Sequence, residues 1–286
     1  MSAEISAEPM TGPHGQDPAT LDPLARQLAE TVTAAGAIAL AMFRRSIKTW
    51  TKGNDSPVTE ADMAVDAFLR ERLLALDPAL GWLSEESEDS PARLSARRLW
   101  VVDPIDGTRA FMAGGTDWAV SAALVEDGRP VAAALFAPAS EELFTAVAGG
   151  GARRNGVVLR AGTRAALEEA AVAGPAADMD SLSRFAAVQR LPRVRSLALR
   201  IARVATGEID IAFAGGNSSD WDIAAADLIV HEAAGRLTTR DGAVPRYNAP
   251  VPRHAPLICA GPALHDAALS AVRHPLPSLQ HRTHHD

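Results

Sequence analysis

The segment from Trp118 to Gly156 constrains the fold more than any other part of the chain, because it reads as a series of short strands joined by tight turns. The dipeptide Asp127-Gly128, between two apolar runs, is typical of a two-residue hairpin turn. Strands connected this closely pair antiparallel, since parallel pairing needs a long crossover. We therefore predict an antiparallel sheet in the middle of the chain.

Segments with helical apolar spacing lie on both sides of this region. Helices are predicted over 24–45, 60–76, 197–207 and 218–235, and a last helix is predicted after 261. Further short strands are predicted over 82–86, 98–103, 193–196, 209–214, 236–239 and 256–261. The elements are mixed without a regular βα alternation, which favours an α+β layered fold over a Rossmann or TIM-barrel arrangement.

The two ends of the chain lack this apolar periodicity. Residues 1–20 are rich in proline, glycine and acidic residues, and residues 275–286 are mostly polar, so both segments are predicted to be flexible. Between them we expect two halves. The half from 21 to 160 would carry most of the candidate metal ligands, and the half from 161 to 274 would complete the site.

Composition excludes several classes of protein. The formal charge is -7 and no dense stripe of lysine and arginine is present, so we expect no nucleic-acid polymer as a partner. The single cysteine, Cys259, excludes an intrachain disulfide and a multi-cysteine zinc site. The sequence has no run of about 18 apolar residues and no signal-peptide pattern, so we expect no transmembrane segment and a cytoplasmic location.

Acidic residues recur at the edges of the predicted elements. They are Asp62 at the start of a helix, Glu85 and Glu86 after a strand, Asp103 and Asp106 after another strand, and Asp222 in the first turn of a helix. A single carboxylate near a helix N-terminus is explained by the helix dipole. Several carboxylates in one place would repel each other unless cations neutralised them. Because Mg²⁺ accepts carboxylates, waters and a substrate phosphate, the pattern predicts a phosphate site with several Mg²⁺ ions.

Gly107 and Thr108 directly follow two of these acids. If they open a helix, their free backbone N–H groups can hold a phosphate. Pro104 restricts the turn that carries Asp103 and Asp106, which helps to aim both carboxylates at the same ion.

Four segments in this order, "SPVTEAD", "LSEES", "DPIDGT" and "WDIAAADLIVHEAAG", resemble the inositol monophosphatase family of Mg²⁺-dependent, lithium-inhibited phosphatases. The resemblance extends from about residue 24 to residue 272. It implies a layered αβαβα sandwich, a small phosphate ester as substrate, and a phosphomonoesterase that uses a metal-activated water without a covalent phosphoenzyme. It also implies a possible homodimer.

The same resemblance implies a set of metal ligands. Glu85, Asp103 and the backbone carbonyl of Ile105 would bind one Mg²⁺. Asp103, Asp106 and Asp222 would bind a second. Glu85 with waters would bind a weaker third ion, so that two or three ions are expected.

Roles in catalysis and substrate binding are implied in the same way. Glu86 would support the metal ligands. Asp62 with Thr108 would orient the attacking water and help to deprotonate it. Gly107 and Thr108 would hold the phosphate through backbone amides, and Asp222 would lie beside the substrate as well as the metal.

The choice of phosphate ester is harder to predict. In the inositol and histidinol phosphate branches a glutamate lies seven residues before the aspartate that corresponds to Asp222, whereas this chain has Gly215 there. The missing acceptor disfavours a polyol substrate. The uninterrupted "SPVTEAD", "LSEE" and Tyr247-Asn248 are more similar to the 3'(2'),5'-bisphosphate nucleotidase branch. That branch commonly has leucine and lysine where this chain has Ile105 and Arg109.

We therefore expect a 3'(2'),5'-bisphosphate nucleotidase, which would release a phosphate from adenosine 3',5'-bisphosphate. Inositol-1-monophosphatase or another sugar phosphatase is the alternative. A catalytically silent regulatory homologue is a third reading, disfavoured because all the carboxylates are present. A second substrate phosphate would need cations, and the candidates are Arg193, Arg195, Arg200 and Arg203, although a solvated basic face is equally consistent with this group.

Overall fold

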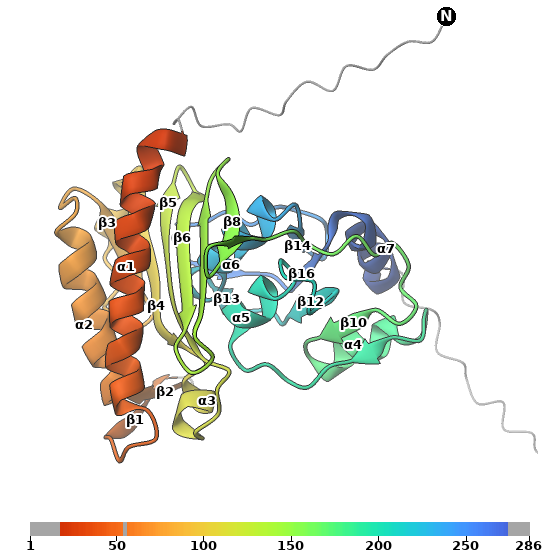
Figure 1. The fold of residues 1–286 in the computed structure, drawn as a ribbon, viewed down its shortest axis with the longest axis horizontal. Helices are drawn as coiled ribbons and strands as arrows, with labels where there is room; N and C mark the ends of the chain where they lie inside the picture. The colour runs from red at the N-terminus through yellow and green to blue at the C-terminus, as the bar shows by residue number, and fades with distance from the viewer. Residues whose placement is uncertain (1–17, 54–55, 274–286) are drawn as a thin grey trace, which may run out of the picture.

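The computed structural model describes residues 18–53 and 56–273, and its centre is a seven-stranded sheet (Figure 1). In order across the sheet the strands are β3 (Gly81–Ser84), β4 (Arg98–Asp106), β5 (Ala119–Glu126), β6 (Arg129–Ala137), β7 (Glu142–Val147), β8 (Gly151–Arg154) and β9 (Val157–Val158). Every neighbouring pair is antiparallel except β3 with β4. The predicted hairpins are confirmed, and Asp127 and Gly128 have the positive φ angles, 49° and 75°, that a tight hairpin turn requires.

A smaller mixed sheet lies beside it. Its order is β11 (Gln189–Arg190), β10 (Ala171–Ala173), β12 (Ile211–Ala214), β16 (Leu257–Ala260) and β14 (Arg236–Thr239). Two short antiparallel ladders complete the strands: β1 (Thr49–Lys52) with β2 (Ser56–Thr59), and β13 (Ser218–Ser219) with β15 (Arg253–His254).

Helices form three layers around these sheets (Figure 1). Helices α1 (Pro18–Met42) and α2 (Glu60–Leu74) cover the outer face of the larger sheet, and α5 (Leu197–Ala202) and α6 (Asp220–Glu232) lie between the two sheets. Helices α4 (Ala176–Leu182) and α7 (Pro262–Arg273) cover the smaller sheet, while α3 (Thr108–Met112) follows β4 and a short 3-10 helix spans Pro91–Ser95. The predicted αβαβα layering is therefore confirmed.

Both faces of the larger sheet are buried at β4, β5 and β6, which explains why these strands are mostly apolar along their whole length. In β4, Trp100 and Val102 pack into the core shared with α1 and α2, whereas Leu99 and Val101 pack into the core shared with α5 and α6. This two-residue alternation is the strand period. It directs the end of β4, with its acidic residues, into the space between the layers.

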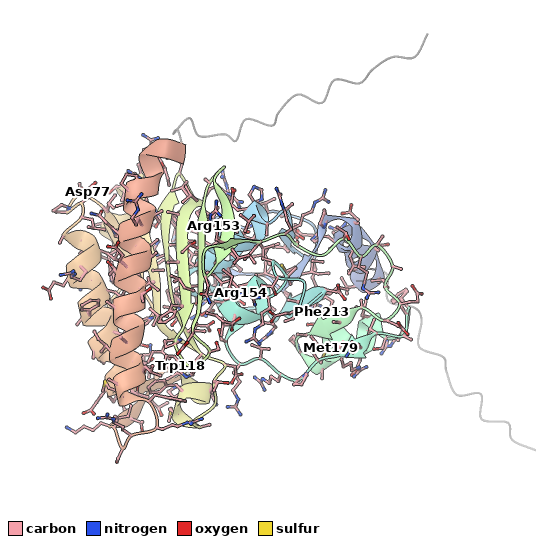
Figure 2. All side chains as sticks on the ribbon, in the orientation of Figure 1. Asp77, Trp118, Arg153, Arg154, Met179 and Phe213 are labelled. Carbon is pink, nitrogen blue, oxygen red and sulfur yellow. The ribbon has the colours of Figure 1, made fainter. Side chains whose placement is uncertain are left out.

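An aromatic cluster fixes the short helix α3 at the end of this sheet. Trp118, which is labelled in Figure 2, is fully buried. Its ring centroid lies 5.3 Å from that of Phe43 and 4.9 Å from that of Phe111. Phe43 follows α1 and Phe111 belongs to α3. The cluster therefore joins the outer helices to the turn that carries Gly107 and Thr108.

The strand predicted over 193–196 is wrong. This segment is irregular, because the backbone N–H groups of Arg195 and Ser196 donate to the side chain and the carbonyl of Asp117 instead of to a ladder. The two-residue strand β11 precedes it. The helix predicted to Gly207 already ends at Ala202 and continues as turns.

The first hairpin, β1 with β2, was not predicted from the sequence. Of the lead-in predicted over 1–20, residues 18–20 belong to α1, while 1–17 and the tail 275–286 lie outside the described residues. The division near residue 160 stays a prediction, since one apolar core includes residues from both halves. Among the residues that the structure describes, none of the helices is long and apolar enough to cross a membrane.

Candidate active site

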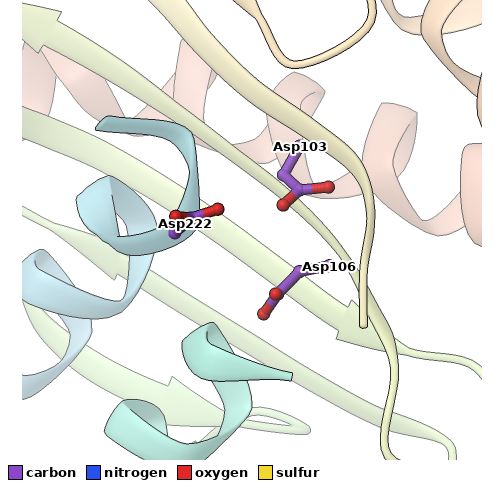
Figure 3. A group of neighbouring side chains, drawn as sticks. All are labelled: Asp103, Asp106 and Asp222. Carbon is purple, nitrogen blue, oxygen red and sulfur yellow. The ribbon is translucent and has the colours of Figure 1, made fainter. Parts of the chain in front are cut away.

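Three carboxylates from two elements face one another at the end of β4 (Figure 3). Asp103 and Asp106 belong to β4, and Asp222 lies in the first turn of α6. Oxygen atoms of the three side chains lie within 4.8 Å of one another. Residues three apart in a regular strand point to opposite faces, but the β4–β5 register shifts between Asp103 and Asp106. The irregularity lets both carboxylates point toward Asp222.

Asp103 is the most confined of these acids. Its side chain is 1 % exposed, and its Oδ1 is buried without a hydrogen-bond partner among the described residues. Burial raises the pKa of Asp103 well above its usual range, and the nearby charges of Glu85 and Asp106 raise it further. Buried carboxylates with unsatisfied oxygens are the ligands of hard divalent cations. A metal ion therefore fits the residues at this position.

Asp106 is held by the first turn of α5. Its carboxylate accepts hydrogen bonds from Ser196 Oγ at 2.5 Å, from the Ala198 N–H at 2.7 Å and from the Leu197 N–H at 3.2 Å. Burial nevertheless raises the pKa of Asp106. Ser196 was not predicted as a site residue, although a serine before a helical apolar pattern is a recognisable cap signal.

Asp222 is positioned by its own helix. Its Oδ2 accepts the Ser219 N–H at 2.7 Å, which closes a capping box at the start of α6. Burial raises the pKa of Asp222 well above its usual range, and the charge of Asp106 raises it further. The helix cap thus fixes this carboxylate opposite the two acids of β4.

Glu85 and Glu86 follow β3 and are bridged by Lys52 from β1. The Lys52 Nζ lies 2.7 Å from Glu86 Oε1 and 3.6 Å from Glu85 Oε1, and it donates to the Glu85 carbonyl at 3.0 Å. The Glu86 side chain is only 2 % exposed, and burial raises the pKa of Glu86 to about 7. Lys52 therefore belongs to the site as the ionic partner of both glutamates.

Asp62 and Thr108 form a separate pair beside the acids. Asp62 Oδ2 accepts the Thr59 N–H at 2.8 Å and the Thr59 hydroxyl at 2.6 Å, again in a capping box. The Thr108 hydroxyl lies 3.3 Å from Asp62 Oδ1 and 3.0 Å from the Ile105 carbonyl. Burial raises the pKa of Asp62. The pair can hold a polar ligand or a water between α2 and α3.

Most of these groups border one cavity of about 650 Å³. Its walls include the five predicted metal ligands Glu85, Asp103, Ile105, Asp106 and Asp222, together with Gly107 and Thr108. Asp62 contacts this lining because the Thr108 hydroxyl donates to it. Glu86 is connected to Glu85 by Lys52, which forms an ion pair with both. The structure therefore brings every predicted site residue to the same place, while the roles predicted for them stay predictions.

The four candidate arginines separate into two groups. Arg193 and Arg195 line the cavity, and Arg109 joins them there. The Arg200 guanidinium instead donates to two backbone carbonyls, and that of Arg203 forms ion pairs with two glutamates. Cationic and acidic groups thus share one cavity, as the binding of a metal-bridged anion requires.

Comparison with known proteins identifies the family. The sequence profile described as "Inositol monophosphatase family" matches residues 20–275. The chain belongs to the inositol monophosphatase family. It is accordingly a phosphatase of phosphate monoesters, from a metal-dependent family, with a buried acidic cluster that can bind metal.

Curated relatives within the inositol monophosphatase family carry different substrate names. The inositol-1-monophosphatase of Rhizobium meliloti is 30% identical over 82% of this chain and 89% of its own length. The histidinol-phosphatase of Mycobacterium tuberculosis is 34% identical over 78% and 86%. The 3'(2'),5'-bisphosphate nucleotidase CysQ of Aggregatibacter actinomycetemcomitans is 29% identical over 74% and 82%. Membership in the inositol monophosphatase family therefore leaves the substrate to be argued from the site.

Solved structures of this family agree with the fold. The extragenic suppressor protein suhB from Bartonella henselae superposes with a TM-score of 0.79 at 27% identity, covering 88% of this chain and 98% of the other. The Thermotoga maritima IMPase superposes with a TM-score of 0.76 at 27% identity, covering 89% and 97%.

Metal removal is expected to destabilise the protein more at high pH than at low pH. Protonation of the raised-pKa carboxylates relieves their repulsion at low pH, and metal binding needs them deprotonated. Saturating Mg²⁺ should therefore raise the melting temperature by about 5 °C at pH 8 relative to EDTA, and by less at pH 5. Differential scanning fluorimetry measures both. An equal Mg²⁺ effect at the two pH values would contradict this expectation.

Proposed function

We propose that the chain is a Mg²⁺-dependent phosphomonoesterase that prefers a substrate with a second anionic group, a 3'(2'),5'-bisphosphate nucleotide. The observation that carries the proposal is the shared cavity, which Arg109, Arg193 and Arg195 line together with the acidic cluster. The acids suit metal ions at the reacting phosphate. Arginine is the side chain best suited to a second phosphate, because its planar fork binds two oxygens at once.

We propose the metal ligands that the resemblance implies. Glu85, Asp103 and the Ile105 carbonyl would hold one Mg²⁺, and Asp103, Asp106 and Asp222 a second, with Glu85 and waters available to a third. Among the described residues, Asp103 Oδ1 is buried without a hydrogen-bond partner, which supports Asp103 as a ligand shared by two ions. When bound, these ions would supply Lewis-acid activation of a water and charge neutralisation of the phosphate oxygens.

Other residues would handle the water and the phosphate. Asp62, fixed by Thr59, would accept a proton from the water that Thr108 orients. The backbone amides of Gly107 and Thr108 would hold phosphate oxygens beside Asp222. Glu86 would act through Lys52, which holds Glu85 in place.

The alternative is the same chemistry on inositol-1-phosphate or another sugar phosphate. Gly215 offers no side-chain acceptor for a polyol hydroxyl, which weighs against this substrate. Relatives of both kinds match the chain at similar identity, so the comparisons favour neither. A catalytically silent protein would be expected to lack at least one carboxylate, and none is missing.

Phosphate release from adenosine 3',5'-bisphosphate and from inositol-1-phosphate, both in Mg²⁺, tests the preference. We expect a higher kcat/KM for the bisphosphate. The double variant Arg193→Gln/Arg195→Gln should lower that value about tenfold or more while changing the inositol-1-phosphate value little, because only the bisphosphate has a second group to bind. Arg153→Gln, an exposed arginine on β8, is the control. Faster turnover of inositol-1-phosphate would reverse the preference.

A further inference from the structure

A second cavity of about 530 Å³ opens at the other half of α6. We call it the α6 pocket. It is bordered by the start of β6, by α6, by β14 and by the loop that follows β14, and the residues that matter here are Arg129, Asp227, His231, Arg236, Val244 and Arg246. The acidic cluster of Asp103, Asp106 and Asp222 does not line this pocket. Asp222 precedes His231 by nine residues on α6, which corresponds to about 13 Å along the helix.

The charge of the α6 pocket is opposite to that of the whole chain. Three arginines and one aspartate line it, which gives 3 − 1 = +2, whereas the formal charge of the chain is -7. The aspartate, Asp227, is 3 % exposed and already accepts the Tyr247 hydroxyl at 2.9 Å beside the Arg129 guanidinium at 3.7 Å. It is therefore satisfied inside the protein, and Arg236 and Arg246 are the other charged residues that line the cavity.

The walls of the α6 pocket are tied together. Arg129 Nη1 donates to the Pro245 carbonyl at 2.6 Å, and the Tyr247 N–H donates to the Gly128 carbonyl at 3.2 Å. Both bonds join the loop after β14 to the turn between β5 and β6. A ligand would therefore meet a preformed surface and lose little free energy in ordering it.

The guanidinium groups of two of these arginines have donors available for a ligand. Arg246 has no hydrogen bond or ion pair with any of the described residues, and the Arg236 guanidinium bonds to Asp266, whose side chain is 73% exposed. Exposed ion pairs of this kind contribute little to stability and exchange readily. Leu237 and Val244 also line the α6 pocket, and Val244 is 54% exposed.

Guanidinium groups beside apolar surface recognise an anion that carries a flat apolar body, since arginine binds phosphate oxygens and also stacks on aromatic rings. The volume is in the range of small-molecule sites. We propose that the α6 pocket binds a nucleoside monophosphate, at a site distinct from the catalytic cavity. This inference is independent of the proposed substrate.

Isothermal titration calorimetry with AMP, in EDTA so that no metal assists binding at the acidic cluster, tests the proposal. The wild-type chain should bind AMP and not adenosine. The variant Arg236→Gln/Arg246→Gln should bind AMP about tenfold more weakly or worse, because both removed groups face the phosphate. Arg70→Gln, an exposed arginine on α2 across the larger sheet, and Arg193→Gln/Arg195→Gln, in the catalytic cavity, should bind AMP as the wild type does.

Three results would overturn the α6 pocket as a nucleotide site. They are absence of AMP binding by the wild type, unchanged binding by Arg236→Gln/Arg246→Gln, and loss of binding in Arg193→Gln/Arg195→Gln alone. The last would place AMP in the catalytic cavity. Phosphatase turnover of the α6-pocket variant without AMP should equal that of the wild type, which shows that the substitutions leave the catalytic residues intact.

Discussion

Replacing Asp103 by Asn is expected to reduce phosphatase turnover by about a thousandfold or more, since a shared metal ligand contributes several kcal/mol to the transition state. The substitution leaves the side-chain volume nearly unchanged but removes the charge that two ions would share. Phosphate release under saturating Mg²⁺ measures the loss. Turnover equal to that of the wild type would mean that Asp103 is not a metal ligand, and the acidic cluster would need another explanation.

The same variant is expected to be at least as stable as the wild type when metal is absent. Asp103 is buried among Glu85, Asp106 and Asp222, and their charges repel it. Removing one charge from this cluster relieves that repulsion. In EDTA at pH 8 the melting temperature of Asp103→Asn should therefore equal or exceed that of the wild type, and Mg²⁺ should raise it less. A large decrease in EDTA would indicate misfolding and would make the activity loss uninformative.

Short sequence patterns were sufficient to predict an α+β layered fold and to locate the acids, whereas the αβαβα order of the layers came from the family resemblance. Apolar periodicity identified the two outer helices, and short apolar runs bounded by turns or acids identified strands of the larger sheet, such as the one that contains Leu99 to Val102. The acids were found because each lies at the edge of an element, where a fold can bring distant segments together. The resemblance then supplied an order of motifs that spacing alone would not have connected.

These short patterns could not predict contacts between residues that are far apart in the sequence. The Asp106 carboxylate accepts a hydrogen bond from Ser196, which lies 90 positions further along the chain. The segment 193–196 does not form its predicted strand because the N–H groups of Arg195 and Ser196 donate to Asp117. The arginines show the same limit. Arg193 and Arg200 are only seven residues apart, yet one lines the cavity and the other is used by backbone carbonyls.

Gly107 to Ala is expected to be among the most destabilising substitutions in the site. Gly107 has a φ of 95°, and an added Cβ would lie 2.8 Å from the Asp117 carbonyl oxygen and 3.3 Å from the Ser196 nitrogen. Both are backbone atoms, and they are joined because the Ser196 N–H donates to the Asp117 carbonyl at 3.2 Å. Ser196 also donates to Asp106, so moving these atoms aside would displace that carboxylate. We expect a loss of about 3 kcal/mol in the free energy of unfolding, from positive φ and overpacking together, and a large loss of turnover.

The substitution Gly156→Ala separates the cost of the positive φ angle from the cost of overpacking. Gly156 has a φ of 81° in the β8–β9 turn, and an added Cβ would meet nothing within 4 Å. Its loss should be about 1 kcal/mol, from backbone strain alone, with turnover unchanged. Chemical denaturation with Mg²⁺ present compares both variants. Equal losses at the two positions would mean that the close approach of Asp117 and Ser196 to Gly107 does not constrain the site, and that the turn after Asp106 can adjust without moving the carboxylate.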